Sequence, residues 1–160
     1  MTRPLAAALL VALWMGAALL TITVVAPGAF AVLPTRAMAG DMVGRVLPAV
    51  FVGAVIVPVV VLWLVPAARR APLALGAAVL AMASAAVALG IVNPRIAALR
   101  VVAVVPIDQL SPVDPRRALF GLLHVVSVAL LGAAMIALGL LLVWMARAVA
   151  SRVVSTPHTR

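Results

Sequence analysis

The sequence predicts an all-α integral membrane protein in which four transmembrane helices form one bundle. Composition is the first reason: 68% of the 160 residues are hydrophobic and 9% are charged, whereas soluble domains have about 45–50% apolar and about 25% charged residues. The second reason is that four charge-free apolar runs each exceed the ~20 residues needed to cross a bilayer. Lipid is therefore the expected solvent, and a chain of this length is expected to form a single domain, 1–160.

Each apolar run predicts one span, and the spans are expected approximately at residues 6–33, 46–66, 72–93 and 118–146. The first run follows Arg3 and contains Ala29-Phe30-Ala31, a tripeptide typical of signal-peptide cleavage. The apolar region of a signal peptide has about 7–15 residues. This run is much longer, so it is predicted to be retained as a span.

The connections between the spans are short, with one exception. Residues 95–117 are expected to form an interfacial connection, and residues 151–160 a short polar tail. Three prolines fall within or near the spans, at Pro27, Pro48 and Pro58. They predict kinks rather than breaks, because neighbouring helices in a membrane bundle satisfy the freed backbone groups.

Small residues predict where the helices touch. The third span has Ala77, Ala81 and Ala85 at a spacing of four. The fourth span has a second series at alternating spacings of four and three: Gly121, Val125, Val128, Gly132, Met135 and Gly139. Close helix packing in lipid favours small residues, so both series are predicted to be packing faces rather than a cofactor groove.

Four spans place both chain termini on one side of the membrane. That side has no side-chain carboxylate, and its arginines are Arg3, Arg69, Arg70, Arg147, Arg152 and Arg160. The opposite side has Arg36, Arg45, Arg95, Arg100, Arg116 and Arg117, together with Asp41, Asp108 and Asp114. Because the arginines divide evenly, the positive-inside rule gives no clear orientation. The long connection dilutes its charges, which slightly favours both termini inside.

Composition also excludes several classes of function. The net charge of +9 comes from scattered arginines with few aromatic residues, a pattern that predicts headgroup contacts and no nucleic-acid binding. The absence of cysteine excludes thiolate catalysis and cysteine metal sites. No P-loop, dinucleotide-binding or zinc-protease motif is present. We therefore expect no catalytic residues, no metal site and no cofactor, and we predict that the protein is not an enzyme.

One end of the predicted bundle collects the polar side chains that are candidates for a site. This candidate polar site consists of Arg36, Asp41, Arg45, Asn93, Arg95, His124 and Ser127. His124 lies ~10 Å into the fourth run and shares a helix face with Ser127. Ionisable groups within a membrane are unfavourable, so an intramembrane histidine is a functional candidate. The alternative is a histidine that fixes packing through a hydrogen bond to a neighbouring helix.

Asp41 is predicted to form a local ion pair. Arg45 lies four residues further along the chain, and Arg36 lies across a bend. An exposed pair of this kind is worth ~0.3–0.5 kcal/mol. A solvated turn with no function is an equally good interpretation of these charges.

Short motifs in chain order carry a family resemblance. They are Leu13-Trp14-Met15-Gly16, Ala26-Pro27-Gly28-Ala29-Phe30, Ala39-Gly40, Leu47-Pro48, Asn93-Pro94-Arg95-Ile96, Leu99-Arg100 and Phe120-Gly121-Leu122-Leu123-His124-Val125-Val126-Ser127. With these motifs the chain resembles the family of small four-span membrane proteins named after transmembrane protein 205. The resemblance implies a four-helix domain with its polar motifs at one end, and it implies no reaction. A departure is the apolar stretch Val128 to Leu131, where that family tends to have a polar residue.

Three functional hypotheses follow from the sequence. The first is a structural or accessory multi-pass protein of the cell membrane, associated with the lipid bilayer and with a homo-oligomer or membrane-protein partner. The second is a small-solute or ion transporter or channel acting as an oligomer. The third is a haem or metal carrier through His124, for which His158 in the tail is the only second histidine. The alanine- and valine-rich, lysine-free composition suggests a bacterial inner membrane.

Overall fold

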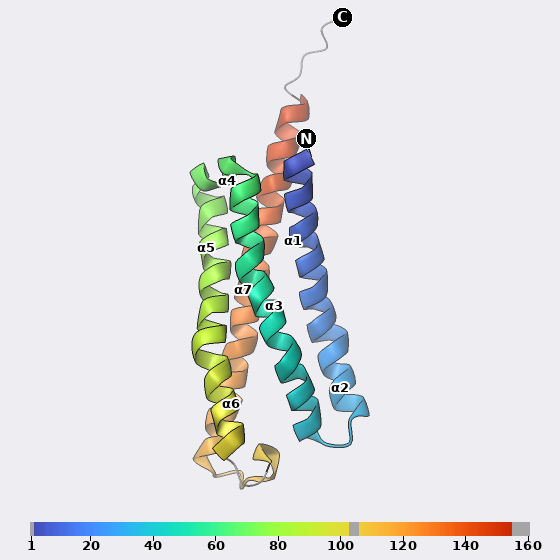
Figure 1. The fold of residues 1–160 in the computed structure, drawn as a ribbon, viewed down its shortest axis with the longest axis vertical. Coiled ribbons are helices and arrows are strands. Elements are labelled where there is room, and N and C mark those ends of the chain that lie inside the picture. Colours follow the sequence, from blue (N-terminus) through green and yellow to red (C-terminus); the bar gives the residue numbers. More distant parts are fainter. Residues whose placement is uncertain (1, 103–105, 155–160) are drawn as a thin grey trace, which may run out of the picture.

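The computed structural model describes residues 2–102 and 106–154, and within them four long helical rods dominate the fold. The rods lie side by side (Figure 1). Helix accounts for 92% of the structure, with no strand among these residues. In chain order the elements are α1 (Thr2–Leu20), η1 (Thr21–Val25), α2 (Ala26–Val32), α3 (Arg36–Leu64), α4 (Pro66–Arg70), α5 (Pro72–Val87), η2 (Ala88–Val92), α6 (Asn93–Val102), η3 (Ile107–Gln109) and α7 (Pro115–Val154).

The rods run up and down, with the N-terminus and the C-terminal end of α7 at one end of the bundle (Figure 1). Rods α1–α2, α3, α5–α6 and α7 each pack against two neighbours in a closed square. Four helical stretches are long and apolar enough to cross a membrane, namely Arg3–Val32, Arg36–Leu64, Pro72–Val101 and Pro115–Ala148. The predicted fold class, a membrane bundle of four helices, is confirmed.

The helices extend beyond the charge-free runs. Helix α3 begins at Arg36, where the side chain of Thr35 accepts a hydrogen bond from the backbone N–H of Met38 at 3.2 Å. Helix α6 continues the third rod to Val102, so the connection expected from residue 95 is helical at its start. The length of a charge-free run reflects the part of a helix that crosses the hydrocarbon core. The helix itself continues into the headgroup layer until a cap or a proline ends it.

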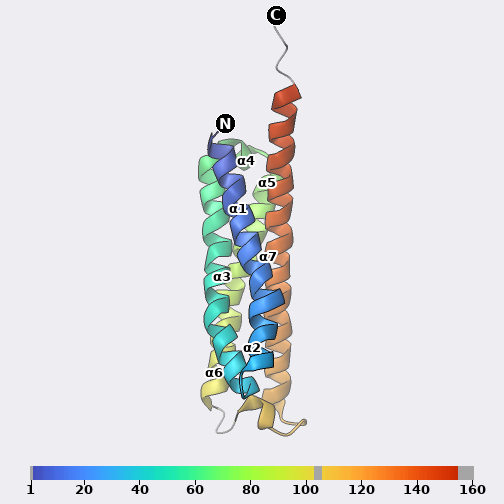
Figure 2. The same ribbon diagram turned by 90° about the vertical axis from the view of Figure 1, so that its right-hand side faces the viewer.

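Helix α7 also extends past its predicted end and stands above the other rods in Figure 2. Residues 151–154 of the predicted polar tail are helical, and residues 155–160 lie outside the described residues. His158, the second histidine of the carrier hypothesis, is among the latter.

Two rods contain a π-helical turn, and each turn ends two residues before a proline. In η1 the N–H of Ala26 bonds to the carbonyl of Thr21, and Pro27 follows. In η2 the N–H of Asn93 bonds to the carbonyl of Ala88, and Pro94 follows. Proline has no N–H and its ring clashes with the carbonyl four residues earlier. The wider turn shifts the hydrogen-bond register and accommodates both effects.

The core fills the half of the bundle near the termini. Its largest fully buried side chains include Phe51, Leu138 and Leu141. The indole N–H of Trp14 donates to the carbonyl of Val50 at 2.9 Å and joins the first two rods.

Of the two predicted packing faces, the alanine series on α5 is confirmed. Ala77, Ala81 and Ala85 are buried, and α5 makes its most extensive contacts with α7. The glycine series on α7 is confirmed only in part. Val125 and Val128 are 64% and 54% exposed, whereas Met135 packs against the core and a Cβ on Gly139 would lie 3.9 Å from Cε of Met15. The small residues come from α5 and the large ones, such as Leu138, come from α7, so α7 does not need glycine in this contact.

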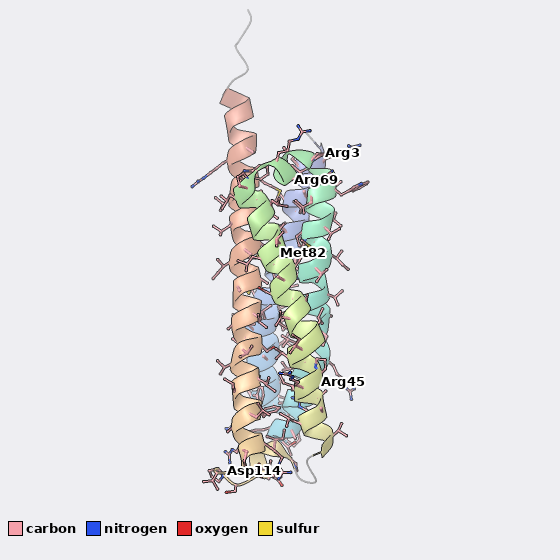
Figure 3. The ribbon with its side chains drawn as sticks, turned by 90° about the vertical axis from the view of Figure 1, so that its left-hand side faces the viewer. Arg3, Arg45, Arg69, Met82 and Asp114 are labelled. Carbon is pink, nitrogen blue, oxygen red and sulfur yellow. The ribbon has the colours of Figure 1, made fainter. Side chains whose placement is uncertain are left out.

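The charges separate between the two ends as the sequence predicts. Arg3 and Arg69 lie at the end with the termini, and Asp114 lies at the opposite end (Figure 3). Arg3, Arg69, Arg70 and Arg147 are exposed.

Candidate ligand cavity at the α2–α6 end

The end of the bundle opposite the termini has a partly open cavity of about 600 Å³. Helices α2, α3, α6 and α7 and the turn η3 contribute to its wall. The lining residues are Phe30, Arg36, Ala37, Gly40, Asp41, Val43, Gly44, Leu47, Asn93, Ile96, Ala97, Arg100, Pro106, Ile107, Phe120, His124 and Ser127.

Local backbone and small side chains create this space. The π-helical turns before Pro27 and Pro94 precede α2 and α6, the two segments that extend the first and third rods to this end. Three of the smallest wall residues, Gly40, Gly44 and Ala97, come from α3 and α6. Larger side chains at these positions would close the gap between the rods.

Arg100 connects three helices beside the cavity. Its Nη1 donates to Oδ1 of Asp41 at 3.0 Å, and its Nη2 donates to the carbonyl oxygen of Gly40 at 3.1 Å. The guanidinium lies 5.6 Å from the centroid of the Phe120 ring, within the ≈ 6 Å range of a cation–π contact. Arg100 on α6 is thereby fixed against α3 on one side and α7 on the other.

Two glycines make room for this guanidinium. A Cβ on Gly44 would lie 2.9 Å from Nη1 of Arg100, and a Cβ on Gly40 would lie 3.1 Å from Nη2. The four-residue spacing of these glycines places both on one face of α3. The sequence therefore provides a flat backbone surface opposite the arginine.

The inner end of the cavity has two polar atoms without a partner. Nδ2 of Asn93 and Oγ of Ser127 are buried and make no hydrogen bond, and Ser127 is only 1% exposed. Asn93 lies seven residues before Arg100 on α6, and Ser127 lies seven residues after Phe120 on α7. At 1.5 Å per residue the backbone positions of Asn93 and Ser127 lie ~10 Å deeper in the bundle than those of Arg100 and Phe120.

The structure brings together only part of the predicted polar site. Arg36, Asp41, Asn93, His124 and Ser127 line the cavity. Arg45 and Arg95 are exposed and do not line it, and Figure 3 shows Arg45 at the outside of the bundle.

The expected local ion pairs of Asp41 are absent from the part of the chain that the structure describes. Neither Arg36 nor Arg45 pairs with it, and its partner is Arg100, 59 residues away. A pairing across helices depends on the rotation of both rods, which spacing along one rod does not reveal.

Sequence reasoning missed Arg100 and Phe120 as parts of this site. A signal was present, because each lies two helical turns from a residue that was chosen, Asn93 and Ser127 respectively. Residues seven apart share a helix face.

His124 lines the cavity wall and is exposed. No hydrogen bond of its imidazole is found within residues 2–102 and 106–154. The hydrogen bond to a neighbouring helix that the alternative interpretation expects is therefore not observed there. The same residues contain no group of three side chains able to hold a metal ion.

The four apolar rods and their one-ended cavity define the class of a small multi-pass membrane protein. Within that class, the chain belongs to the family described as "Domain of unknown function (DUF4149)", whose model matches residues 9–104. No curated protein and no solved structure matches the chain. The matched region includes Asp41, Asn93 and Arg100, whereas His124 and Ser127 on α7 lie outside it.

Proposed function

We propose that this protein is a non-catalytic accessory protein of the cell membrane that binds a small ligand in the cavity at the α2–α6 end. The observation that carries the proposal is the pair of unpartnered polar atoms on Asn93 and Ser127. A buried polar group left unsatisfied costs about 1–3 kcal/mol. A ligand that accepts hydrogen bonds would offset this cost, and a cavity of about 600 Å³ is within the usual range for ligand sites.

Binding is a better fit to the geometry than conduction through one copy of the chain. Beyond Ser127 the same face of α7 continues with Leu131, Ala134 and Leu138, which are at most 3% exposed. Phe51 and Leu141 also fill the interior toward the termini. A solute that entered the cavity would meet this packed core, so the transporter hypothesis requires a path between copies of the chain.

The carrier hypothesis has weaker support. His124 is available on the cavity wall, but the neighbours that the structure describes offer no set of three metal-ligating side chains. We therefore place His124 in the ligand cavity as a polar wall residue.

The proposal also includes a closer relationship to the family named after transmembrane protein 205. Six of the seven motifs behind that resemblance contribute residues to one cavity; the exception is Leu13-Trp14-Met15-Gly16. A bacterial inner membrane and a homo-oligomeric or membrane-protein partner remain part of the same proposal.

A plug variant tests whether the cavity holds a ligand. Ala97 lines the cavity and Ala98, also exposed, does not, so Ala97→Trp and Ala98→Trp form a matched pair on one helix. Native mass spectrometry of protein extracted from membranes in mild detergent should detect a bound small molecule on the wild type and on Ala98→Trp. Ala97→Trp should lose it. A wild type with no bound molecule, or a molecule that persists in Ala97→Trp, would contradict the proposal.

A further inference from the structure

We propose that the ligand is an elongated organic anion, with an oxygen acceptor that binds Asn93 and Ser127 and a negative charge near Arg36 and Arg100. This inference rests on the proposed function and adds the chemical class of the ligand. Three features of the cavity carry it: the donors at its inner end, the charge at its outer end, and the distance between them.

The inner end favours an oxygen that accepts hydrogen bonds. Nδ2 of Asn93 is a donor, and the hydroxyl of Ser127 also donates. Both atoms are buried without a partner, and Ser127 is only 1% exposed. A carboxylate, carbonyl or hydroxyl oxygen can accept from both. An ammonium group has only N–H donors and leaves Nδ2 of Asn93 unsatisfied.

The outer end favours a negative charge. Among the lining residues whose side chains the structure describes, Arg36 and Arg100 are cationic and Asp41 is the one carboxylate. Arg100 is already bound to Asp41 and to the carbonyl of Gly40. Arg36 makes no ion pair with Asp41 or Asp114, the carboxylates whose side chains the structure describes, so its charge is not used by either of them.

The distance between the two ends requires an elongated molecule. The backbone positions of Arg100 and Asn93 are ~10 Å apart along α6, and those of Phe120 and Ser127 are ~10 Å apart along α7. Between them the wall includes Leu47, Ile96 and Ala97, which suits a methylene chain. A phospholipid fits poorly, because its acyl tails would reach the inner end and leave both donors without an acceptor.

A series of water-soluble eight-carbon probes separates charge from shape. The probes are ω-hydroxyoctanoate, suberate, octanediol and diaminooctane, which share chain length and carry polar groups at both ends. Thermal unfolding of the purified protein in detergent is followed against probe concentration. We expect saturable stabilisation by hydroxyoctanoate and suberate, at least tenfold weaker apparent binding of octanediol, and none of diaminooctane. Stabilisation by the anions should disappear in Ala97→Trp and persist in Ala98→Trp.

Two further pairs of variants test the two ends of the site. Arg36→Gln should weaken hydroxyoctanoate binding about tenfold, whereas Arg45→Gln, an exposed arginine on the same helix that does not line the cavity, should not. Ser127→Ala should weaken it by a similar factor. Ser84→Ala, a change at a buried serine outside the cavity wall, should leave it unchanged.

The outcomes distinguish this inference from the proposed function. If octanediol or diaminooctane binds more tightly than the anions, and this binding is lost in Ala97→Trp, the anion inference is overturned. The proposal of a ligand cavity then still stands. Anion stabilisation that persists in Ala97→Trp places the anions on surface arginines and also overturns it. If no probe binds, but a molecule from the membrane co-purifies with the wild type and is lost in Ala97→Trp, the anion inference alone fails. If neither is found, both proposals fail.

Discussion

The two halves of the bundle are built from the same four rods but enclose different interiors. Near the termini the rods surround fully buried apolar side chains such as Phe51, Leu138 and Leu141. Near α2 and α6 they surround a cavity of about 600 Å³ with unpartnered polar atoms at its inner end. Composition alone does not separate these halves, because long apolar sequence continues through both.

The difference shows how a short membrane protein can make internal space. Two of the four rods have a π-helical turn and a proline where the cavity begins, and α3 has glycines on the facing surface. In lipid no hydrophobic effect forces helices together, so close contact depends on complementary side chains. The alanine face of α5 provides that complementarity to α7 in the packed half, whereas the cavity half has a guanidinium against glycine.

The largest expected effect is at the centre of the packed half. Phe51→Ala should lower the free energy of unfolding by about 3 kcal/mol, because Phe51 is fully buried and its removal leaves a void. Phe30→Ala is the matched change in the cavity half, where the ring is 50% exposed, and it should cost less than about 1 kcal/mol. Unfolding in a denaturing detergent titration measures both. Equal losses would mean that the two halves are packed alike.

A pair of glycines should give the next largest difference. A Cβ on Gly53 would lie 2.6 Å from Cδ1 of Trp14, whose indole is held by its hydrogen bond to Val50. Gly53→Ala should therefore destabilise the protein by about 1–3 kcal/mol. Gly44→Ala meets only the flexible end of Arg100, which can move, so its loss should stay below about 1 kcal/mol. The same titration applies, and a larger loss for Gly44→Ala would show that the Arg100 contact is as rigid as the core.

The features that the sequence predicted well depend on hydrophobicity averaged over long stretches of the chain. Four spans, an all-α fold and the placement of every aspartate at one end follow from runs of apolar residues and from an even number of crossings. Asn93 and Ser127 are also predictable as site residues, because a polar residue in or beside an apolar run stands out.

The features that the sequence did not reveal depend on how one rod is rotated against another. The partner of Asp41 is on α6 rather than on its own helix. The first part of the glycine series on α7, with Val125 and Val128, is exposed, whereas Met135 packs against the core. In a chain rich in alanine and glycine many faces meet the small-residue rule, and only the packed structure selects between them.

The smallest expected effect concerns acid, to which the two ends should respond differently. Asp114 precedes α7 at the cavity end and accepts from the side chain of Arg116 at 2.7 and 3.1 Å and from its backbone N–H at 2.8 Å. These hydrogen bonds, the side-chain ones first, hold the pKa of Asp114 below its ordinary value of 3.8.

A lowered carboxyl pKa makes the folded state more stable above the unfolded pKa, and this stabilisation is lost as the pH falls through the folded pKa. The wild type should therefore lose stability below about pH 4, and Asp114→Asn, which keeps a capping side chain, should lose less over the same range. Thermal unfolding in detergent between neutral pH and pH 3 measures the difference. The control is Arg69→Gln at the end without side-chain carboxylates, whose acid profile should match that of the wild type. An Asp114→Asn profile that also matched the wild type would show that the acid sensitivity of the cavity end arises from another group.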